Sequence, residues 1–313
     1  QAEYINNLIE VKNILLFFEI EVFAEISFQI ANMTSVLNSL FHKDTTLALF
    51  NGSHNIFNKD ILSLTKQKED LKEKKLFFIK NGLAVYNDKE KKIFFDVVKP
   101  TNSYINSKLH SGTLSFEFSA KKEKIITNCG SLNKIYGDKP NYLRFSAAHS
   151  TIILNNTNIS ELDYKKSYTR IPKKINYQNN EEENQLTLIC VHDGYKENYK
   201  KIVKRKLTIS KLKNTIIGQD SIMPIKLNFK KILFNIRFHL MPDSQSSLTN
   251  SKKKVIIKTK NQNTWVFEAE NKLEIDESIF IDLNDKIQQS KQIVINGFVE
   301  DSIKVINWSV KEL

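Results

Sequence analysis

Residues 110–130 read HSGTLSFEFSAKKEKIITNCG, and this stretch decides the fold class. The run LSFEF alternates large apolar with polar side chains, which is the pattern of a strand with one face in a core. The basic cluster Lys121–Lys124 follows and is expected to form a hairpin loop, after which Ile125 and Ile126 belong to a returning strand. The stretch therefore predicts two antiparallel strands joined by a short turn.

The same pattern extends from Leu76 to the C-terminus. Short runs rich in Ile, Val, Phe and Thr alternate with turn residues, among which Asn and Asp replace the scarce Gly and Pro. The further runs are KLFFIK, LAVYND, KIFFDVV, STIILNN, QLTLICVHDG, RKLTIS, NTIIGQD, ILFNIRFHL, KVIIKTK, TWVFEAE, IFIDL, KQIVING and IKVINWSV. So many strands with no long helix between them predict a mainly β fold over residues 76–313, an antiparallel β-sandwich. Two polar stretches, residues 177–184 and 242–254, are expected to be long exposed loops.

Residues 1–75 have a different character. Apolar residues recur there at three- and four-residue steps, which predicts a helix or a helix pair before residue 40. They are Leu8, Val11, Ile14, Leu15, Phe18, Val22 and Ile26. Residues 41–55 predict a connector with a turn at Asn51-Gly52, and residues 56–75 a charged, helix-compatible stretch. Since the chain begins within a helical pattern, we expect a fragment or a processed form whose apolar helix face packs on a larger helical domain.

The bulk composition limits the possible classes. With 313 residues, of which 41% are hydrophobic, the chain can bury a sizeable core. The most apolar early segment, residues 14–30, is interrupted by Glu19, Glu21 and Glu25, so no transmembrane segment is expected. No P-loop, GxGxxG or GxSxG motif occurs, which argues against nucleotide binding and against a serine hydrolase. The two cysteines have no CxxC partners, which leaves open only a single disulfide between them.

The formal net charge is +12, from 47 Lys and Arg against 35 Asp and Glu. One interpretation is attraction to a polyanion such as a nucleic acid, an anionic membrane or an acidic polysaccharide. The other is a compositional bias toward Lys, Asn and Ile. The basic residues are scattered and not arranged in stripes, which favours the compositional bias and gives no indication of nucleic-acid binding.

Three residues carry the main chemical signal. His110 and His149 each follow a loop and precede an alternating strand, a position where a sheet edge displays binding groups. Asn128 ends the returning strand, and its separation from His110 (128 − 110 = 18) brings both to the same end of the sheet. Two histidines and a carbonyl oxygen point to a divalent-metal site, although an amide is a poor zinc ligand. The alternative is a pair of hydrogen-bonded histidines that support a loop.

Two further segments are candidates for binding an anion. His192 ends a strand in HDGY, where the Asp-Gly pair is first of all a turn former. Arg237 and His239 alternate along ILFNIRFHL, so both are expected on one face, which either grips an anion or is an ordinary solvated face. Trp265 and Trp308 lie within strands and are expected in the core, not as platforms for sugar stacking.

Eight segments, in order along the chain, resemble the heparinase II/III superfamily of polysaccharide lyases, in particular a branch found in alphaproteobacteria. They are LALFNG (47–52), HSGTLSFEF (110–118), ITNCG (126–130), RFSAAHST (144–151), HDGY (192–195), RFHLMP (237–242), TWVFEAE (264–270) and QIVING (292–297). The resemblance implies a C-terminal antiparallel sandwich of stacked sheets, preceded by the last helices of an (α/α) toroid. Residues 1–75 would then be the remnant of that toroid with its connector.

The resemblance also implies a reaction. Lyases of this family cleave the bond at C4 of a uronic acid by β-elimination: one group neutralises the carboxylate, a base removes the C5 proton, and an acid protonates the leaving oxygen. Much of that machinery comes from the toroid, so this chain alone is expected to be inactive. The implied partners are an acidic polysaccharide, such as a glycosaminoglycan, and the missing toroid. The alternative is a non-catalytic carbohydrate-binding or structural module derived from the same fold, and the expected location is the periplasm or envelope of a Gram-negative bacterium.

The match to the family's sandwich motifs is partial. His110 matches the second histidine of an H-x-H-A-D motif, and His149 matches a later histidine; both are metal ligands in the family. Lys108 stands in place of the first histidine, Gly112 in place of the motif's Asp, and Asn128 in place of a metal-binding Asp. A divalent metal, zinc or else manganese or calcium, is the implied cofactor, with two acidic positions replaced.

The remaining candidates follow from the same resemblance. Tyr136, with Tyr142 as second choice, lies in the loop from which some family lyases take a sandwich tyrosine, and Arg144 matches an arginine before the final histidine. The expected roles are catalysis by Tyr136, Arg144 and His149, substrate binding by Lys108, His192, Arg237 and His239, and metal binding by His110, Asn128 and His149.

Overall fold

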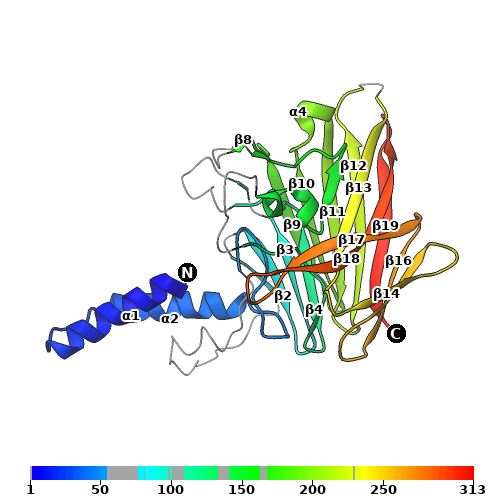
Figure 1. Cartoon of the computed structure of the whole chain (residues 1–313). Helices are drawn as coiled ribbons and strands as arrows, with labels where there is room; N and C mark the ends of the chain where they lie inside the picture. The colour runs from blue at the N-terminus through cyan, green and yellow to red at the C-terminus, as the bar shows by residue number, and fades with distance from the viewer. Residues whose placement is uncertain are drawn as a thin grey trace.

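A computed structural model describes residues 2–54, 77–80, 82–97, 99–100, 109–132, 141–162, 168–227 and 230–313. In it, a pair of helices projects from a β-sandwich (Figure 1). Every strand pair within these ranges is antiparallel, so the expected mainly β, antiparallel fold is confirmed. The helix-compatible stretch 56–75 lies outside the described residues. None of the described helices combines the length and the apolarity that crossing a membrane requires.

The helical pair consists of α1 (Ala2–Phe17) and α2 (Ala24–Ser39). The chain turns back between them, where Glu19 has a positive φ of 54°. A small core that includes Ile5, Ile30 and Leu37 holds the two helices together. Many large apolar side chains of the pair nevertheless stay exposed: Val11, Ile14, Leu16, Phe17, Phe18, Ile20, Phe23 and Phe28.

The first sheet has five strands in chain order: β1 (Phe77–Lys80), β2 (Leu83–Asn87), β3 (Lys91–Asp96), β4 (Phe116–Ala120) and β5 (Glu123–Ile126). The predicted hairpin is β4–β5, and its turn uses Lys121 and Lys122 with positive φ. Strands β3, β4 and β5 of this sheet are buried on both faces, because the connector covers the face turned away from the sandwich core. There Phe50 of the connector packs with Val85 and Phe94.

The remaining strands form two larger sheets and a short ribbon. The eight-stranded sheet has the order β14 (Gln245–Leu248), β15 (Lys254–Lys258), β16 (Thr264–Ala269), β19 (Lys304–Glu312), β12 (Thr215–Pro224), β11 (Lys201–Ser210), β10 (Gln185–His192) and β9 (Ile175–Glu181). The four-stranded sheet has the order β17 (Leu273–Ile281), β18 (Ile287–Val299), β13 (Ile232–His239) and β6 (Ile152–Leu154). The ribbon is β7 (Glu161–Leu162) with β8 (Tyr168–Arg170), and a single helical turn, α4 (Lys196–Tyr199), follows β10.

One aromatic side chain shows how the sheets are stacked. Trp308 of the eight-stranded sheet stacks on Phe116 of the five-stranded sheet, with ring centroids 5.4 Å apart. The same indole meets Phe238 of the four-stranded sheet edge-on at 4.8 Å. The five- and four-stranded sheets therefore form one layer over the eight-stranded sheet, and a bridge between Thr127 and His239 joins them. Trp265 and Trp308 are both buried, which confirms their expected place in the core.

Two sequence-based expectations about loops were wrong. Residues 177–184 and 242–254 contribute strands β9 and β14, which form the two edges of the eight-stranded sheet. An edge strand pairs on one side only and here exposes most of its side chains, so it needs no apolar alternation. The open question of a disulfide is also answered, because Cys129 and Cys190 are both free and buried.

Candidate functional site

The candidate site lies where three loops meet at one end of the five-stranded sheet. The loop before β4 is tied to the segment before β6 by the Ser111 N–H, which donates to the Arg144 carbonyl at 2.8 Å. The loop after β5 joins them through the Cys129 N–H, which donates to the Ala148 carbonyl at 3.0 Å. Backbone hydrogen bonds therefore bring together the ends of the three segments that the sequence indicated.

His110 and His149 contact each other directly. The His110 Nδ1 and His149 Nε2 atoms are 3.1 Å apart, and the two rings meet edge to face with centroids 5.2 Å apart. His149 Nδ1 lies 2.8 Å from the Phe145 carbonyl oxygen, which can only accept, so this nitrogen carries a proton. His149 Nε2 then accepts a hydrogen bond from the Nδ1–H group of His110, so the free lone pair of the neutral His110 ring is on its Nε2 atom.

Burial keeps both imidazoles neutral. It lowers the pKa of His149 to about 4, although the Phe145 carbonyl favours the protonated form. The pKa of His110 falls well below its ordinary value for the same reason, and the nearby His149 and Arg144 lower it further. At neutral pH the pair is therefore uncharged, and His110 Nε2 makes no hydrogen bond to any of the described residues.

Asn128 holds the loops and offers no free oxygen. Its Oδ1 accepts the backbone N–H of Ser150 at 2.9 Å, and its Nδ2 donates to the Leu49 carbonyl at 3.3 Å. The residue therefore links the connector to the backbone just after His149. Its buried position, 1% exposed, gives these hydrogen bonds little competition from water.

The implied divalent metal would need free donor atoms on His110, Asn128 and His149. Both ring nitrogens of His149 and the Asn128 amide are already hydrogen-bonded, which leaves His110 Nε2 as the one donor atom of these three side chains without a described partner. A Cβ atom on Gly112 would lie 2.7 Å from His149 Cδ2, so the space for an acidic side chain here is filled by an imidazole. The arrangement does not fit a three-ligand metal centre. The predicted metal site at His110, Asn128 and His149 stays a prediction.

Arg144 and a second arginine support the loops. Arg144 is buried, and its Nε donates to the Leu109 carbonyl at 3.0 Å, next to His110. From the eight-stranded sheet, Arg205 reaches the same loops, because its Nη1 donates to the carbonyls of Leu114 (2.9 Å) and Ser150 (2.7 Å). No pattern in the sequence indicates Arg205, because Leu114 and Ser150 lie in loops that are 91 and 55 residues away from it in the chain.

His239 lies beside the pair, whereas Arg237 lies farther along β13. The His239 N–H donates to Ser150 Oγ at 3.0 Å, and its Nδ1 lies 2.7 Å from Ser278 Oγ. Burial, with the nearby His149 and Arg237, lowers the pKa of His239 to about 3. Both residues face the outer side of their strand as expected, but His239 is buried and Arg237 Nη1 donates to Gln292 at 3.1 Å. Neither arrangement tests the predicted role in substrate binding.

His192 belongs to a different part of the sandwich. It ends β10, is 1% exposed, and its Nδ1 accepts the Gly194 N–H at 3.1 Å. Tyr136 and Lys108 lie outside the described residues. Tyr142 is described and is exposed, with its ring edge-on to Phe145, close in sequence to Arg144.

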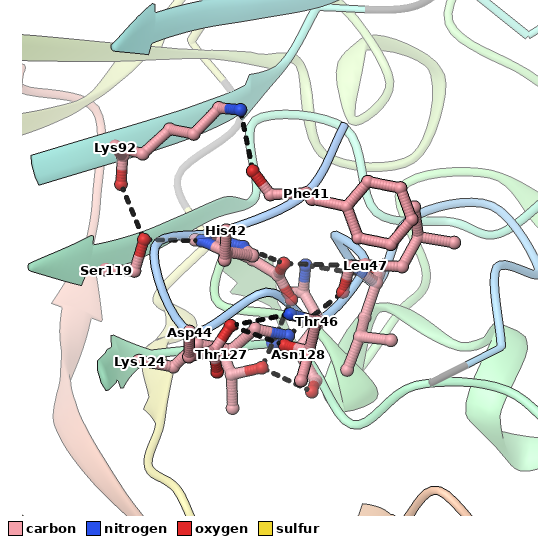
Figure 2. A network of polar contacts seen from close by, with 12 residues as sticks. Phe41, His42, Asp44, Thr46, Leu47, Lys92, Ser119, Lys124, Thr127 and Asn128 are labelled. Carbon is pink, nitrogen blue, oxygen red and sulfur yellow. Dashed lines mark hydrogen bonds and ion pairs between the residues drawn. The ribbon is translucent and has the colours of Figure 1, made fainter. Parts of the chain in front are cut away.

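A buried carboxylate, Glu117, lies beneath the loops and is not among the residues that the sequence indicated. Both oxygens of Glu117 accept two hydrogen bonds each: from His42 Nε2 (2.8 Å) and the Leu49 N–H (2.9 Å), and from the Asn128 N–H (2.8 Å) and Thr127 Oγ1 (3.2 Å). Figure 2 shows this network around His42, where connector and sheet meet. Alternation along FEF predicts a solvent-facing Glu117, and nothing in the pattern shows that the connector covers that face.

Comparisons with known proteins agree with this architecture. Residues 72–309 match the family model described as heparinase II/III-like, C-terminal. The structure resembles heparan sulfate lyase HepC from Pedobacter heparinus, with a TM-score of 0.76 and 15% identity over 99% of this chain and 51% of that chain. It also resembles heparinase III, with a TM-score of 0.78 and 11% identity over 100% of this chain and 52% of that chain.

A curated relative has a different kind of name. FtsZ-localized protein C from Caulobacter vibrioides is 24% identical over 212 residues, which are 63% of this chain and 36% of the relative. The chain thus spans about half the length of HepC and of heparinase III and 36% of this relative.

Proposed function

Because this chain belongs to the heparinase II/III-like family, whose C-terminal domain its residues 72–309 match, we propose that it is the β-sandwich part of a polysaccharide lyase. The substrate would be an acidic polysaccharide that contains uronic acid, cleaved by β-elimination. Residues 1–75 would form the end of a helical toroid with its connector, and residues 76–313 the sandwich. By analogy with the heparin-degrading lyases that share the fold, we place the protein in the periplasm or cell envelope.

The observation that carries this proposal is the His110–His149 contact. His149 fixes the tautomer of His110 by accepting a hydrogen bond from its Nδ1–H group, and the Phe145 carbonyl in turn fixes the tautomer of His149. His110 Nε2 is left with a lone pair and is the atom of the pair that can accept a proton. In this proposal His110 takes part in proton transfer and His149 is a positioning residue.

Other parts of the reaction need groups outside the described residues. A base whose pKa lies well below neutrality is unprotonated but weak, so His110 needs a substrate whose C5 proton has been made acidic. Neutralisation of the substrate carboxylate would make the C5 proton more acidic. The helical toroid, with the predicted Tyr136, would supply the neutralising group and the acid that protonates the leaving oxygen. This chain by itself would then be inactive.

The test uses the full-length parent protein. It is incubated with a panel of uronic-acid polysaccharides, with and without added zinc, manganese or calcium, while the ultraviolet absorbance of the 4,5-unsaturated product is followed. We expect a rise with one polymer that falls by about a hundredfold or more in His110→Ala, the loss of a proton-transfer group. His54→Ala, another histidine near the loops, is the control and should keep most of the activity. A flat trace across the panel would reject the lyase.

A second candidate is a non-catalytic carbohydrate-binding or structural module. The geometry favours this candidate in one respect, because His110 and His149 are buried and the Asn128 amide is hydrogen-bonded to backbone groups. The name of the Caulobacter vibrioides relative describes a place in the cell and not a reaction. Retained binding to one polymer with no product in the absorbance assay would support this candidate over the lyase.

A further inference from the structure

A second feature of the sandwich lies apart from the histidine pair. An open hollow of about 790 Å³ is lined by side chains from residues 170–176, 191–202 and 225–226. Its walls come from β8, β9, β10, α4 and the start of β11, and α4 and β8 lie at the upper end of the molecule in Figure 1, away from the helical pair. This volume is in the range of sites that hold a small ligand or a few sugar units.

The lining of the hollow is strongly basic. It contains six basic side chains against two acidic ones, Asp193 and Glu197. The basic residues are Arg170, Lys173, Lys174, Lys196, Lys200 and Lys226. A concave surface with charges of one sign concentrates the field and attracts ions of the opposite sign.

The two acidic side chains are already occupied. Asp193 Oδ1 accepts the backbone N–H groups of Lys173 (2.8 Å) and Lys174 (3.0 Å). Glu197 forms an ion pair with Lys173 at 2.7 Å. The ammonium groups of Lys174, Lys196 and Lys226, by contrast, are exposed and form no ion pair with any residue that the structure describes.

The inner wall of the hollow holds two buried donors without acceptors. His192 Nδ1 accepts the Gly194 N–H, so in the neutral ring the proton is on Nε2, which has no partner among the described residues. Arg170 Nε also lacks an acceptor there. The Nη atoms of Arg170 donate to the carbonyls of Asn158, Ile159 and Gly194, and Nη2 forms an ion pair with Glu161 at 3.2 Å. Because the charge of Arg170 is paired, the positive potential of the hollow comes from the two buried donors and from the unpaired Lys174, Lys196 and Lys226.

We propose that this hollow is a second anion-binding site, which takes the carboxylate or sulfate groups of an acidic oligosaccharide. The ligand class rests on the proposed function; the anion site itself rests on the hollow and its charges. No Phe, Tyr or Trp side chain lines the described walls, and the imidazole of His192 is buried, so the stacking platform that single-stranded nucleic acid uses is missing. A concave wall also fits a flexible saccharide better than the flat surface of a bilayer.

The hollow and the histidine pair share one intervening loop. Arg170 Nη2 donates to the Asn158 carbonyl at 2.7 Å, and Asn158 Oδ1 accepts the Ser146 N–H at 2.9 Å. Ser146 in turn hydrogen-bonds to Ser111, next to His110. A polymer bound in the hollow would therefore lie on the other side of a loop that contacts the candidate site, and it would hold the substrate there without touching the reacting bond.

The test compares two triple variants of the chain that each remove three exposed positive charges. The first is Lys174→Ala/Lys196→Ala/Lys226→Ala in the hollow. The matched control is Lys252→Ala/Lys253→Ala/Lys272→Ala, on turns elsewhere in the sandwich. Calorimetry or fluorescence measures the dissociation constants of size-defined uronic-acid oligosaccharides, with and without sulfate, and of inorganic sulfate. We expect the hollow variant to bind the oligosaccharides about tenfold more weakly and the control to change less than about twofold.

Several outcomes would overturn the proposal. They are equal losses in both variants, no loss in the hollow variant, or tighter binding of a single-stranded DNA of equal charge that competes with the saccharide. Binding that depends on the hollow without any product in the absorbance assay would reject the lyase and keep the anion site. In the opposite case, cleavage needs His110, but neither cleavage nor oligosaccharide affinity changes in the hollow variant. That result would keep the lyase and reject the anion site.

Discussion

At the scale of single residues, the candidate site is a set of buried polar groups that satisfy one another. The imidazole of His149 fills the space beside Gly112, accepts a hydrogen bond from His110 and donates one to the Phe145 carbonyl. Beneath it, Glu117 accepts four hydrogen bonds in the region between connector and sheet. Such groups are costly to disturb, because a buried polar atom that loses its partner cannot turn to water.

Gly112 should tolerate no side chain while His149 is present. A Cβ atom there would lie 2.7 Å from the imidazole, so Gly112→Ala should destabilise the fold by about 1–3 kcal/mol through overpacking. In His149→Ala the space is free, and adding Gly112→Ala should cost little. A denaturant-melt double-mutant cycle measures this coupling. If the losses in unfolding free energy of the two single variants add up in the double variant, the contact with His149 is not the reason for the destabilisation.

Glu117→Gln should destabilise the protein by about 2–4 kcal/mol at pH 7, because the buried ion loses charge-assisted hydrogen bonds. Burial alone would raise the pKa of Glu117, but the charge of Lys124 and the hydrogen bond from His42 outweigh it and lower the pKa to about 2. The folded protein then binds fewer protons than the unfolded chain between about 2 and the ordinary carboxyl value. The carboxylate's contribution is therefore present above that ordinary value and lost as the pH falls toward 2.

Denaturant melts of both proteins across this pH range measure the effect. The difference in unfolding free energy between wild type and Glu117→Gln should shrink as the pH falls below the ordinary carboxyl value. Glu90→Gln, at an exposed position, serves as the control and should differ little from wild type at any pH. A constant difference for Glu117→Gln would contradict the ionised carboxylate.

At the scale of secondary-structure elements, the strands were predictable and several of their environments were not. Each apolar run that the sequence indicated lies in or overlaps a strand, because alternation reports which side chains face a core. The sequence pattern did not predict the polar edge strands β9 and β14, because an edge strand needs no apolar face. The helical pair showed its periodicity but not its turn at residues 18–23.

The helical pair should make this chain self-associate. Exposed apolar side chains on α1, α2 and the turn between them form a surface that water solvates poorly, and any surface that covers it gains hydrophobic free energy. We expect Phe17→Ser/Phe23→Ser/Phe28→Ser to shift the chain toward monomer in sedimentation velocity. The control Leu212→Ser/Ile217→Ser/Ile303→Ser removes exposed apolar groups from the sandwich and should leave association unchanged. An equal effect of the two variants would argue against a specific role for the helices.

At the scale of the whole molecule, one buried arginine connects the two layers of the sandwich. Arg205 and Asp220 lie on adjacent strands of the eight-stranded sheet, with Nε–Oδ1 and Nη2–Oδ2 distances of 2.7 and 2.8 Å. Through Nη1 the arginine reaches carbonyls of the loops that carry the candidate site. The position of the histidine pair thus depends on the stacking of the sheets.

Arg205→Met should cost about 3–5 kcal/mol, because it leaves Asp220 charged and buried without its partner. The double variant Arg205→Met/Asp220→Leu should cost less than the sum of the single changes, since it removes both charges together. Arg237→Met, a half-buried arginine with one hydrogen bond to a side chain, is the control and should cost about 1 kcal/mol or less. Urea melts measure the wild type, Arg205→Met, Asp220→Leu, the double variant and Arg237→Met. A loss in the double variant equal to the sum of the two single losses would contradict the coupling.

The sequence by itself determined the fold class, the strands with an apolar face, the two tryptophans in the core and the meeting of His110, Asn128 and His149 at one sheet end. These follow from alternation and from chain separation, which are local properties. Only the tertiary structure decided that the connector buries Glu117 and that Arg205 supports the loops from another sheet. The tertiary structure alone also placed His192 in a basic hollow away from His110 and His149. Such contacts join residues far apart in the chain, so they depend on how sheets and connector stack, and no periodic pattern records that.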